Sequence, residues 1–261
     1  MGTILIDRPL SGVVRLTFNR PERLNAVDAA FISEFRAAMS DIATTLTDRV
    51  VILRGSGRGF CSGMDQTHTG YEHLTAEGDL DGLLQAQQDV AHLVLEIRAL
   101  PQPVIAAVKG AAVGAGFAFA LASDIRVAGE SAGFAIGANR IGLSGADMGM
   151  TWLLPRFVGA SRAAEWLLTG RKVGAAEADA AGLASRVVPD EELDAAALDT
   201  AEQILRNQDF AVRLTKRAIW GSVVTADLLT AINFENQTQA LAAGQLIRSL
   251  REVARETAGE R

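Results

Sequence analysis

Two glycine-bearing loops carry the residue types that could stabilise negative charge on an oxygen atom. The first loop runs from Arg58 to Asp65 and the second from Lys109 to Phe117. Each interrupts a strand-to-helix transition, and open α/β sheets bind ligands at the carboxyl ends of their strands. The small residues of the second loop would let a ligand approach the backbone, and the helix after it would offer free N–H groups. This pattern favours a site built from backbone donors.

Asp147 is the acid whose surroundings could adapt it to proton transfer. It stands alone in the apolar and glycine-rich stretch Leu143–Gly149, just before a predicted helix. An aspartate with its ordinary pKa of ~3.9 is a poor acid at neutral pH, but burial without a counter-charge would raise that pKa. In the alternative role, Asp147 caps the N-terminus of the helix. The sequence leaves both roles open.

Metal and thiol chemistry find little support in the sequence. His68 and His73 lie in a predicted loop, but no set of cysteines or acids completes a zinc site around them. His92 has the place of an ordinary residue of a helix surface or core. Cys61 is the only cysteine, and no histidine is placed beside it, so we expect it to pack inertly. No metal site is predicted.

The elements that must position these residues repeat a strand, a loop and a helix. Val13–Phe18 is a β-branched run typical of a strand, and Asp28 is a suitable N-cap for an amphipathic helix that extends to about Leu46. The same alternation follows, with strands at Val50–Leu53, Pro103–Val108, Ile125–Val127 and Phe134–Ile136, and helices at Leu83–Leu100, Phe117–Ala122 and from Asp147 toward Phe157. The recurrence predicts an α/β fold.

Beyond Gly159 the pattern changes to helices separated by short turns. The predicted helices are Ser161–Leu168, Ala175–Ala181, Asp190–Arg206 and further stretches from Asp209 onward, and only Ala184–Val188 is expected to be extended. We therefore predict a core over residues 1–190 and a helical C-terminal region over residues 191–261.

Composition excludes several classes of partner. The chain has 261 residues, enough for one α/β domain with an appendage. Its net charge is -6, and no run of lysines and arginines forms the basic stripe that a nucleic acid requires. The N-terminus lacks the basic-then-apolar order of a signal peptide, and no apolar stretch reaches the ~18 residues of a membrane span. A cytoplasmic protein without nucleic-acid or membrane partners is expected.

The motifs resemble those of a known family when they are read in order. The string Gly59–Asp65 looks like the first oxyanion motif of the crotonase (enoyl-CoA hydratase/isomerase) superfamily, and Ala106–Gly116 looks like its second. The likeness continues through Ser123–Ala128, Leu154–Arg156 and Leu168–Arg171 and covers roughly residues 10 to 190. The resemblance implies a spiral of repeated β-β-α units over residues 1–190 that binds acyl-CoA. It also implies oligomer contacts by the helical region at residues 191–261, in a homotrimer or hexamer.

The resemblance also implies roles for individual residues. The backbone N–H groups of Met64 and Ala115 become the oxyanion hole for a thioester carbonyl. The loop around Arg23 and Leu24, together with Ser62 and Asp65, should border the adenine and pantetheine parts of coenzyme A, which is part of the substrate. No separate cofactor is expected.

The chain departs from the hydratases of this superfamily at both catalytic glutamates. Their positions hold Ala118 and Ala138, so ordinary hydration chemistry lacks its acids. Asp147 matches an aspartate that dienoyl-CoA isomerases and aryl-CoA dehalogenases use. Three hypotheses follow: an isomerase or atypical hydratase in which Asp147 moves a proton, a catalytically weak binder of CoA thioesters, and a dehalogenase-like or hydrolytic enzyme with Asp147 as nucleophile.

Overall fold

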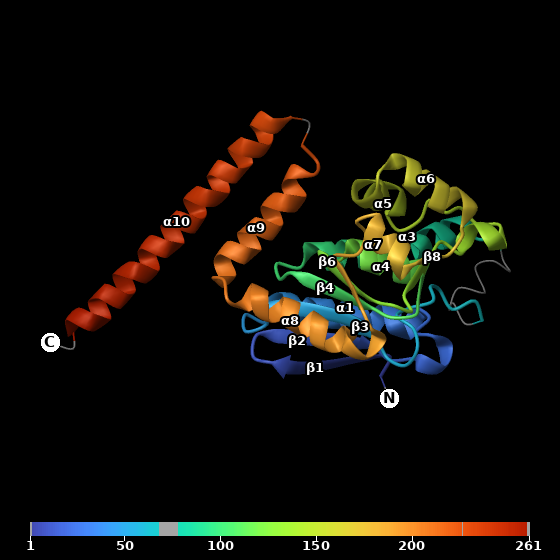
Figure 1. Cartoon of the computed structure of the whole chain (residues 1–261), viewed down its shortest axis with the longest axis horizontal. Coiled ribbons are helices and arrows are strands. Elements are labelled where there is room, and N and C mark those ends of the chain that lie inside the picture. Colours follow the sequence, from blue (N-terminus) through green and yellow to red (C-terminus); the bar gives the residue numbers. More distant parts are fainter. Residues whose placement is uncertain (1, 68–77, 226, 260–261) are drawn as a thin grey trace. The chain divides into compact units, whose positions relative to one another are not determined.

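The computed structural model describes residues 2–67, 78–225 and 227–259 (Figure 1). The chain divides into two compact units, Met1–Glu202 and Gln203–Arg261. The division falls later in the chain than the boundary that we placed at residues 190/191 from the sequence.

A mixed sheet forms the base of the first unit. In the described part of the chain its strand order is β1-β2-β3-β4-β6-β9. The strands are β1 (Ile4–Leu10), β2 (Val13–Phe18), β3 (Val50–Gly55), β4 (Val104–Val108), β6 (Ile125–Gly129) and β9 (Arg186–Val188). Strand β1 pairs antiparallel with β2, and each later pair is parallel. The carboxyl ends of the parallel strands therefore meet at one edge, where the two glycine-bearing loops begin.

A second, smaller sheet carries the second loop. It contains β5 (Ala111–Val113), β7 (Gly133–Ala135) and β8 (Val173–Gly174), with β5 parallel to β7 and β7 antiparallel to β8. The sequence predicted a glycine-bearing loop from Lys109 to Phe117, and that segment instead contains strand β5. Three residues are too few for a periodic signal, so tertiary pairing decides their conformation.

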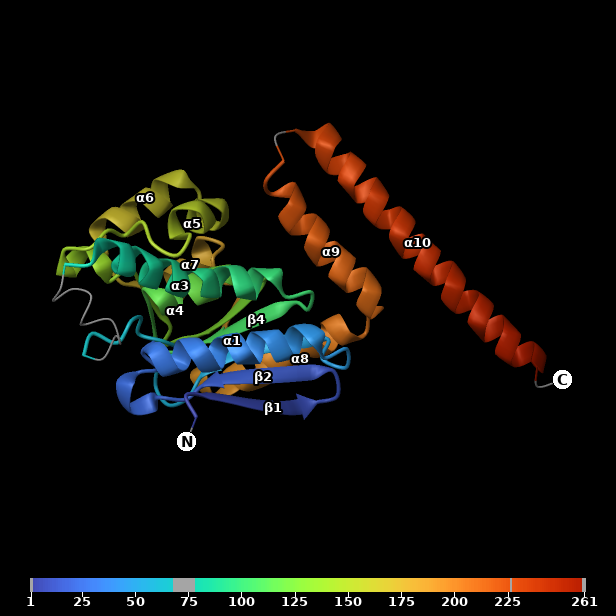
Figure 2. The ribbon, with the colours of Figure 1, turned by 180° about the vertical axis from the view of Figure 1, so that it is seen from behind.

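Helices pack on these sheets and on one another in the first unit. They are α1 (Ala29–Thr44), α3 (Leu80–Ala99), α4 (Ala115–Ala122), α5 (Met150–Val158), α6 (Ala160–Thr169), α7 (Ala175–Ala180) and α8 (Leu193–Leu205), with short 3-10 turns η1 (Pro21–Arg23), η2 (Ala138–Ile141) and η3 (Asp190–Glu192). Helices α1 and α3 lie side by side (Figure 2). The predicted N-cap is confirmed, because the Asp28 side chain accepts a hydrogen bond from the Phe31 N–H at 2.8 Å.

Aromatic packing fixes α4 at the centre of the unit. Every residue of α4 is buried. Phe119 of this helix stacks on Phe35 of α1 with ring centroids 5.4 Å apart, and it contacts Phe18 of β2 at 5.9 Å. Because buried aromatic pairs contribute both apolar burial and a preferred geometry, they hold the helix at a fixed place. The N-terminus of α4, which follows the second loop, is thereby positioned.

The second unit consists of helices. Helix α9 (Asp209–Ser222) packs against the long helix α10 (Leu228–Gly259). No helix in the described residues has the length and hydropathy that a membrane span requires. The predicted α/β class and the helical C-terminal region are confirmed.

Candidate active site

Three segments that are far apart in the sequence run side by side where the first loop meets the second. The Val27 N–H donates to the Gly63 carbonyl at 2.8 Å, and the Asp65 N–H donates to the Val27 carbonyl at 2.8 Å. On the other side of the loop, the Val113 N–H donates to the Cys61 carbonyl at 2.9 Å. The first loop therefore forms the middle of a short ladder between residues 24–27 and strand β5.

This ladder decides where the Met64 amide points. Met64 forms a parallel bridge with Val27, and the flanking Gly63 carbonyl and Asp65 N–H make the hydrogen bonds of that bridge. In a parallel bridge the central residue directs its own N–H to the opposite side. The Met64 N–H consequently faces the side of β5 and Gly114, and it has no hydrogen-bond partner among the described residues.

The Ala115 amide lies at the same junction. Ala115 is the first residue of α4, so its N–H has no partner within the helix. The preceding Gly114 has φ of 52°, a conformation that turns the chain sharply into the helix. A Cβ built on Gly114 would stand 3.7 Å from the Gly63 Cα. Two backbone donors, Met64 and Ala115, thus flank one close contact between the loops.

Glycine is required for this close contact. A Cβ at Gly116 would overlap the carbonyl oxygen of Cys61, and a Cβ at Gly110 would overlap that of Arg58. Both obstacles are backbone atoms, which cannot rotate away. The glycines of the second loop therefore set the distance between the first loop and the start of α4.

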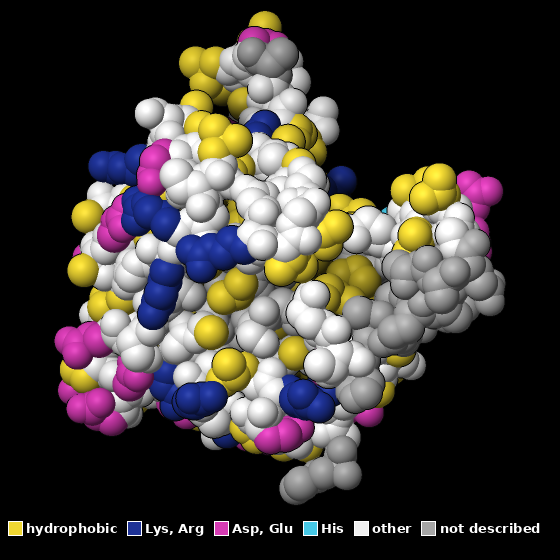
Figure 3. Space-filling view, turned by 90° about the vertical axis from the view of Figure 1, so that its right-hand side faces the viewer, with side chains coloured by type: hydrophobic (Ala, Val, Ile, Leu, Met, Phe, Trp, Pro, Cys, Tyr) yellow, Lys and Arg dark blue, Asp and Glu magenta, His cyan; other side chains and the backbone are white. Residues whose placement is uncertain are grey.

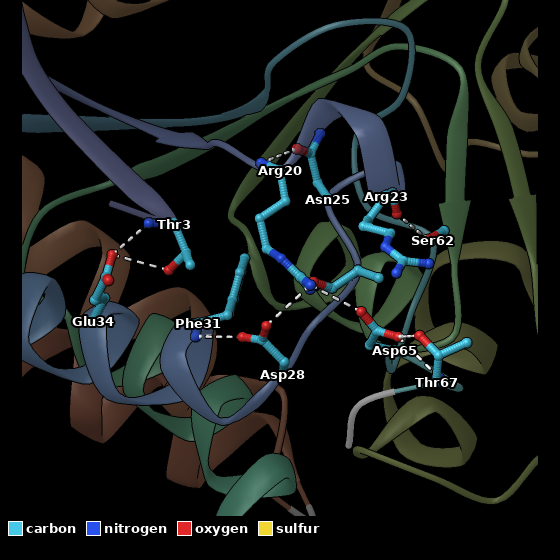
Figure 4. Close-up of polar contacts among 11 residues, drawn as sticks. Thr3, Arg20, Arg23, Asn25, Asp28, Phe31, Glu34, Ser62, Asp65 and Thr67 are labelled. Carbon is cyan, nitrogen blue, oxygen red and sulfur yellow. Dashed lines mark hydrogen bonds and ion pairs between the residues drawn. The ribbon is translucent and has the colours of Figure 1, made fainter. Parts of the chain in front are cut away.

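Arg20 holds the first loop in place through an ion-pair cluster (Figure 4). Its guanidinium lies 2.9 Å from the Asp65 carboxylate and 3.0 Å from that of Asp28, and it also donates to the Ala26 carbonyl. Asp65 is buried and accepts hydrogen bonds from the Thr67 N–H and hydroxyl at 3.0 and 2.7 Å. Burial opposes ionisation of Asp65, but these donors and Arg20 hold the pKa of its carboxyl well below the ordinary value.

Asn25 connects the backbone of Arg20 to the start of the first loop. Its side chain is fully buried, donates to the Ser56 and Gly59 carbonyls at 3.0 and 2.8 Å, and accepts from the Arg20 N–H at 2.9 Å. Asn25 has φ of 58°, which asparagine tolerates better than most residues. The types and spacing of Arg20 and Asn25 in the sequence gave no indication that the two residues would meet here.

Arg23, Leu24 and Ser62 meet beside the first loop. The Ser62 N–H donates to the Leu24 carbonyl at 3.0 Å, and the Ser62 hydroxyl donates to the Arg23 carbonyl at 3.3 Å. Figure 4 shows Arg23 and Ser62 next to each other. Arg23 is exposed, and Leu24 and Ser62 are half-buried, so all three are accessible to a ligand. The structure brings these residues together with Asp65, whose carboxylate is engaged internally.

Asp147 lies in the loop before α5, and its side chain does not cap that helix. Helix α5 begins at Met150, its N-cap is Gly149, and no side chain accepts from its first turn. The capping alternative is therefore wrong, because the left-handed Met148 and Gly149 separate Asp147 from the helix. Instead, Gln87 of α3 donates through Nε2 to Asp147 Oδ1 at 2.5 Å.

The environment of Asp147 suits an acid/base. Its side chain is half-buried, and burial raises the pKa of the carboxyl, an effect that the Met148 N–H and the Gln87 side chain partly offset. No hydrogen bond between described residues links Asp147 to Met64 or Ala115. The connection is through packing, because α4 contacts both α3 and α5.

Alanine occupies the two positions at which the sequence resemblance led us to expect the hydratase glutamates. Ala118 is fully buried in α4, and Ala138 is half-buried at the start of η2. Neither can donate or accept a proton.

A cavity of about 310 Å³ adjoins the second loop. Its lining includes Ala111 and Val113 of β5, Gly137, and the basic residues Arg140 and Lys172.

On the face of the molecule in Figure 3, Lys and Arg side chains are interspersed with apolar and acidic ones, unlike a continuous basic stripe.

The remaining candidates for chemistry are Cys61 and the three histidines. Cys61 is fully buried, and burial raises the pKa of its thiol to about 12, so it is not a nucleophile. His92 is exposed on α3. Within the described residues, no group of histidine, cysteine and acidic side chains could hold a metal ion. His68 and His73 lie outside the described residues.

Comparison with known proteins gives consistent matches. A family model described as enoyl-CoA hydratase/isomerase matches residues 9–245. The probable enoyl-CoA hydratase echA12 of Mycobacterium bovis is 39% identical over 94% of this chain and 85% of the relative. The 1,2-epoxyphenylacetyl-CoA isomerase of Escherichia coli is 36% identical over 93% of this chain and 91% of the relative. A crystal structure of a probable enoyl-CoA hydratase/isomerase from Mycobacterium abscessus is 37% identical, with a TM-score of 0.85 over 92% of this chain and 90% of that chain.

Proposed function

The chain belongs to the enoyl-CoA hydratase/isomerase family, and from that premise we propose that it moves the double bond of an enoyl-CoA thioester, with Asp147 as its acid/base. The family prediction and the crotonase-like α/β fold agree with the family match and the structural superposition. Among the relatives, one is a 1,2-epoxyphenylacetyl-CoA isomerase, and others are probable hydratases. The site's own residues must decide between these chemistries.

The pattern of acids favours isomerisation over hydration. Hydration needs one group to activate water and another to deliver a proton to carbon, whereas isomerisation can use one group that takes and returns a single proton. Ala118 and Ala138 remove the hydratase pair, and Asp147 supplies one half-buried carboxyl with a raised pKa. That single carboxyl is the observation that carries the proposal.

The proposed steps use only groups of this chain. The thioester carbonyl accepts hydrogen bonds from the N–H groups of Met64 and Ala115. The Asp147 carboxylate removes a proton from C2 of a 3-enoyl thioester, and the electron pair delocalises into a dienolate whose oxygen lies in this hole. Asp147, whose half-buried carboxyl can exchange its proton with solvent, then delivers a proton to C4, which leaves a 2-enoyl thioester and a carboxylate. Each backbone donor can contribute about 3 kcal/mol to the stabilisation of such an oxyanion.

Binding of coenzyme A is proposed at the rim formed by Arg23, Leu24 and Ser62. Their accessibility suits contacts with the adenine and pantetheine parts, and an exposed guanidinium can pair with phosphate. Asp65 was expected to border the ligand as well, and we propose that it acts mainly by holding the Met64 loop through Arg20. We further propose a cytoplasmic homotrimer or hexamer.

Asp147→Asn tests this function. We expect the variant to lose 10²- to 10⁴-fold in double-bond migration and in exchange of the α-proton in deuterated buffer, because an amide cannot accept the proton. Asp81→Asn, which changes an exposed acid at the start of α3, is the matched control and should retain activity. A panel of 3-enoyl- and 2-enoyl-CoA thioesters should be followed by NMR.

A second candidate function, a weak binder of CoA thioesters, is favoured by alanine at both glutamate positions. Tight binding of the panel with neither exchange nor double-bond migration in the native chain would support that candidate and exclude the isomerase. Full exchange by Asp147→Asn would show that another group moves the proton. Use of Asp147 as a nucleophile needs a second base, and no such base contacts it among the described residues.

A further inference from the structure

Gln87 contacts Asp147 from a helix that no sequence motif connected with the site. Gln87 belongs to α3 and Asp147 to the loop before α5, so the contact joins two elements across 60 positions of the chain. Nε2 and Oδ1 lie 2.5 Å apart, so the amide N–H of Gln87 donates directly to the carboxyl group of Asp147. Helix α3 and helix α5, which follows the Asp147 loop, both pack on α4, whose N-terminus carries the Ala115 amide. Gln87 therefore ties the proposed acid/base to the scaffold of the proposed oxyanion hole.

We propose that Gln87 is a positioning residue for Asp147, which fixes the orientation of the carboxylate and favours its ionised form. This inference rests on the proposed function. The amide nitrogen of glutamine only donates, and hydrogen bonds to an ionised acceptor are stronger than those to a neutral one, so this contact favours the base form that removes the substrate proton. The backbone after Asp147 is left-handed at Met148 and Gly149, and the Asp147 side chain does not cap helix α5. The hydrogen bond from Gln87 therefore supplies an orientation that the helix does not.

The balance of groups around Asp147 makes Gln87 important. Burial raises the pKa of this carboxyl, while the Met148 N–H and the Gln87 side chain lower it. The elements that pack nearby carry Asp89 and His92 on α3, Arg140 in η2, Arg156 on α5 and Arg162 on α6. None of these pairs with Asp147 among the described residues. Gln87 is thus its only side-chain hydrogen-bond partner in that part of the chain.

Gln87→Met tests the proposal, since methionine keeps the length and helix propensity but removes the donor. The isomerisation rate, as kcat/KM, should fall on the acid side where Asp147 becomes protonated. Loss of the donor destabilises the carboxylate, so this acid limb should move upward by roughly half to one pH unit, a value reduced for partial exposure. At its plateau kcat should fall about 10-fold because the carboxylate is less well oriented, with little change in KM.

Gln87→Glu should move the limb further upward, because two adjacent carboxyls share a proton. Gln85→Met makes the same exchange on the opposite side of α3, at an exposed residue without a hydrogen bond among the described residues, and should leave the profile unchanged. His92→Gln removes an imidazole, which is a titratable group, from helix α3. The acid limb of the pH profile of this variant should also coincide with that of the native chain.

The outcomes separate this inference from the proposed function. An unchanged acid limb in Gln87→Met, with Asp147→Asn inactive, would overturn the positioning role alone. A loss of stability or of rate in Gln87→Met without a shift of the limb would show a merely structural role and would also overturn it. Activity in Asp147→Asn would overturn the proposed function, and the inference with it.

Discussion

Asp65 shows how a single buried charge can serve a site without touching a substrate. Its carboxylate is saturated by Arg20 and Thr67, yet its backbone follows Met64 directly and donates to Val27. The ion pair therefore acts on the direction of the Met64 amide. Removing one partner of such a pair leaves the other charge buried and uncompensated. The free-energy cost of that unpaired charge exceeds the net stabilisation that the intact pair provides.

We predict that Asp65→Asn lowers the free energy of unfolding by about 2 kcal/mol at pH 7. The pKa of Asp65 is lowered in the folded state, so its contribution is fully present above the unfolded value of 3.8 and is lost as the pH falls toward the folded value. The difference between native chain and variant should therefore shrink below pH 3.8. Urea unfolding at pH 7 and at pH 3 measures it.

The control for this prediction is Asp7→Asn, which breaks the more exposed pair with Arg15. Surface pairs of this kind contribute ~0 to 1 kcal/mol, so the control should change stability little at either pH. Equal destabilisation by Asp65→Asn at both pH values would contradict the assignment to an ionised carboxylate.

At the scale of elements, the site depends on how closely one loop approaches one helix. Gly116 lies in the first turn of α4 with the Cys61 carbonyl against it. Since both sides are backbone, a methyl group there can be accommodated only if the first loop and α4 separate. The Met64 and Ala115 amides would separate with them.

We predict that Gly116→Ala costs about 2 kcal/mol of stability and lowers kcat about 100-fold, the effect of losing one oxyanion donor. Thermal unfolding and isomerisation kinetics measure the two effects. Gly174→Ala is the matched control, because nothing lies within 4 Å of a Cβ at that position and its φ of -80° suits alanine. A variant with native kcat would show that the spacing of the two loops does not limit catalysis.

The sequence predicts elements well where the signal is local. The β-branched run of β2 and the Asp28 cap of α1 each depend on a few neighbouring residues, and both are confirmed. Strand β1 was missed, because its mixture of charged and apolar residues is the pattern of an exposed edge strand. The helix expected from Asp147 begins at Met150, because the left-handed turn at Met148 has no signature in the residue types.

The residues of the candidate site likewise divide into those with a local sequence signal and those without one. The two glycine loops are contiguous motifs, so their residues could be named from the sequence, and the structure brings these loops together. Gln87 and Arg20 could not be given roles, because each acts through a partner 60 or 45 positions away. Such contacts depend on the register of the sheet and the packing of α3, which residue types alone do not specify.

At the scale of the whole molecule, the two units differ in how they bury apolar surface. The first unit has a continuous core that includes the aromatic cluster of β2, α1 and α4. In the second unit, large apolar side chains on α10 are exposed, among them Leu241, Leu246, Ile247 and Leu250. Exposed apolar surface of this extent on a helix is typical of an interface. It supports the proposed oligomer contacts of the C-terminal region.

We predict that the protein has a solution mass three or six times the 27.6 kDa of one chain, and that the double substitution Leu246→Lys and Leu250→Lys lowers it. These two residues are one turn apart on one face of α10, so two buried lysines would each need a counter-charge that an apolar interface lacks. Ser249→Lys on the same turn is the control for added charge. Light scattering coupled to size exclusion gives the mass, and circular dichroism tests whether α10 stays helical. A native chain that is monomeric at micromolar concentration would assign the exposed leucines to another role. So would a double variant with the native mass and intact helices, because an interface formed by Leu246 and Leu250 cannot tolerate a lysine at both positions.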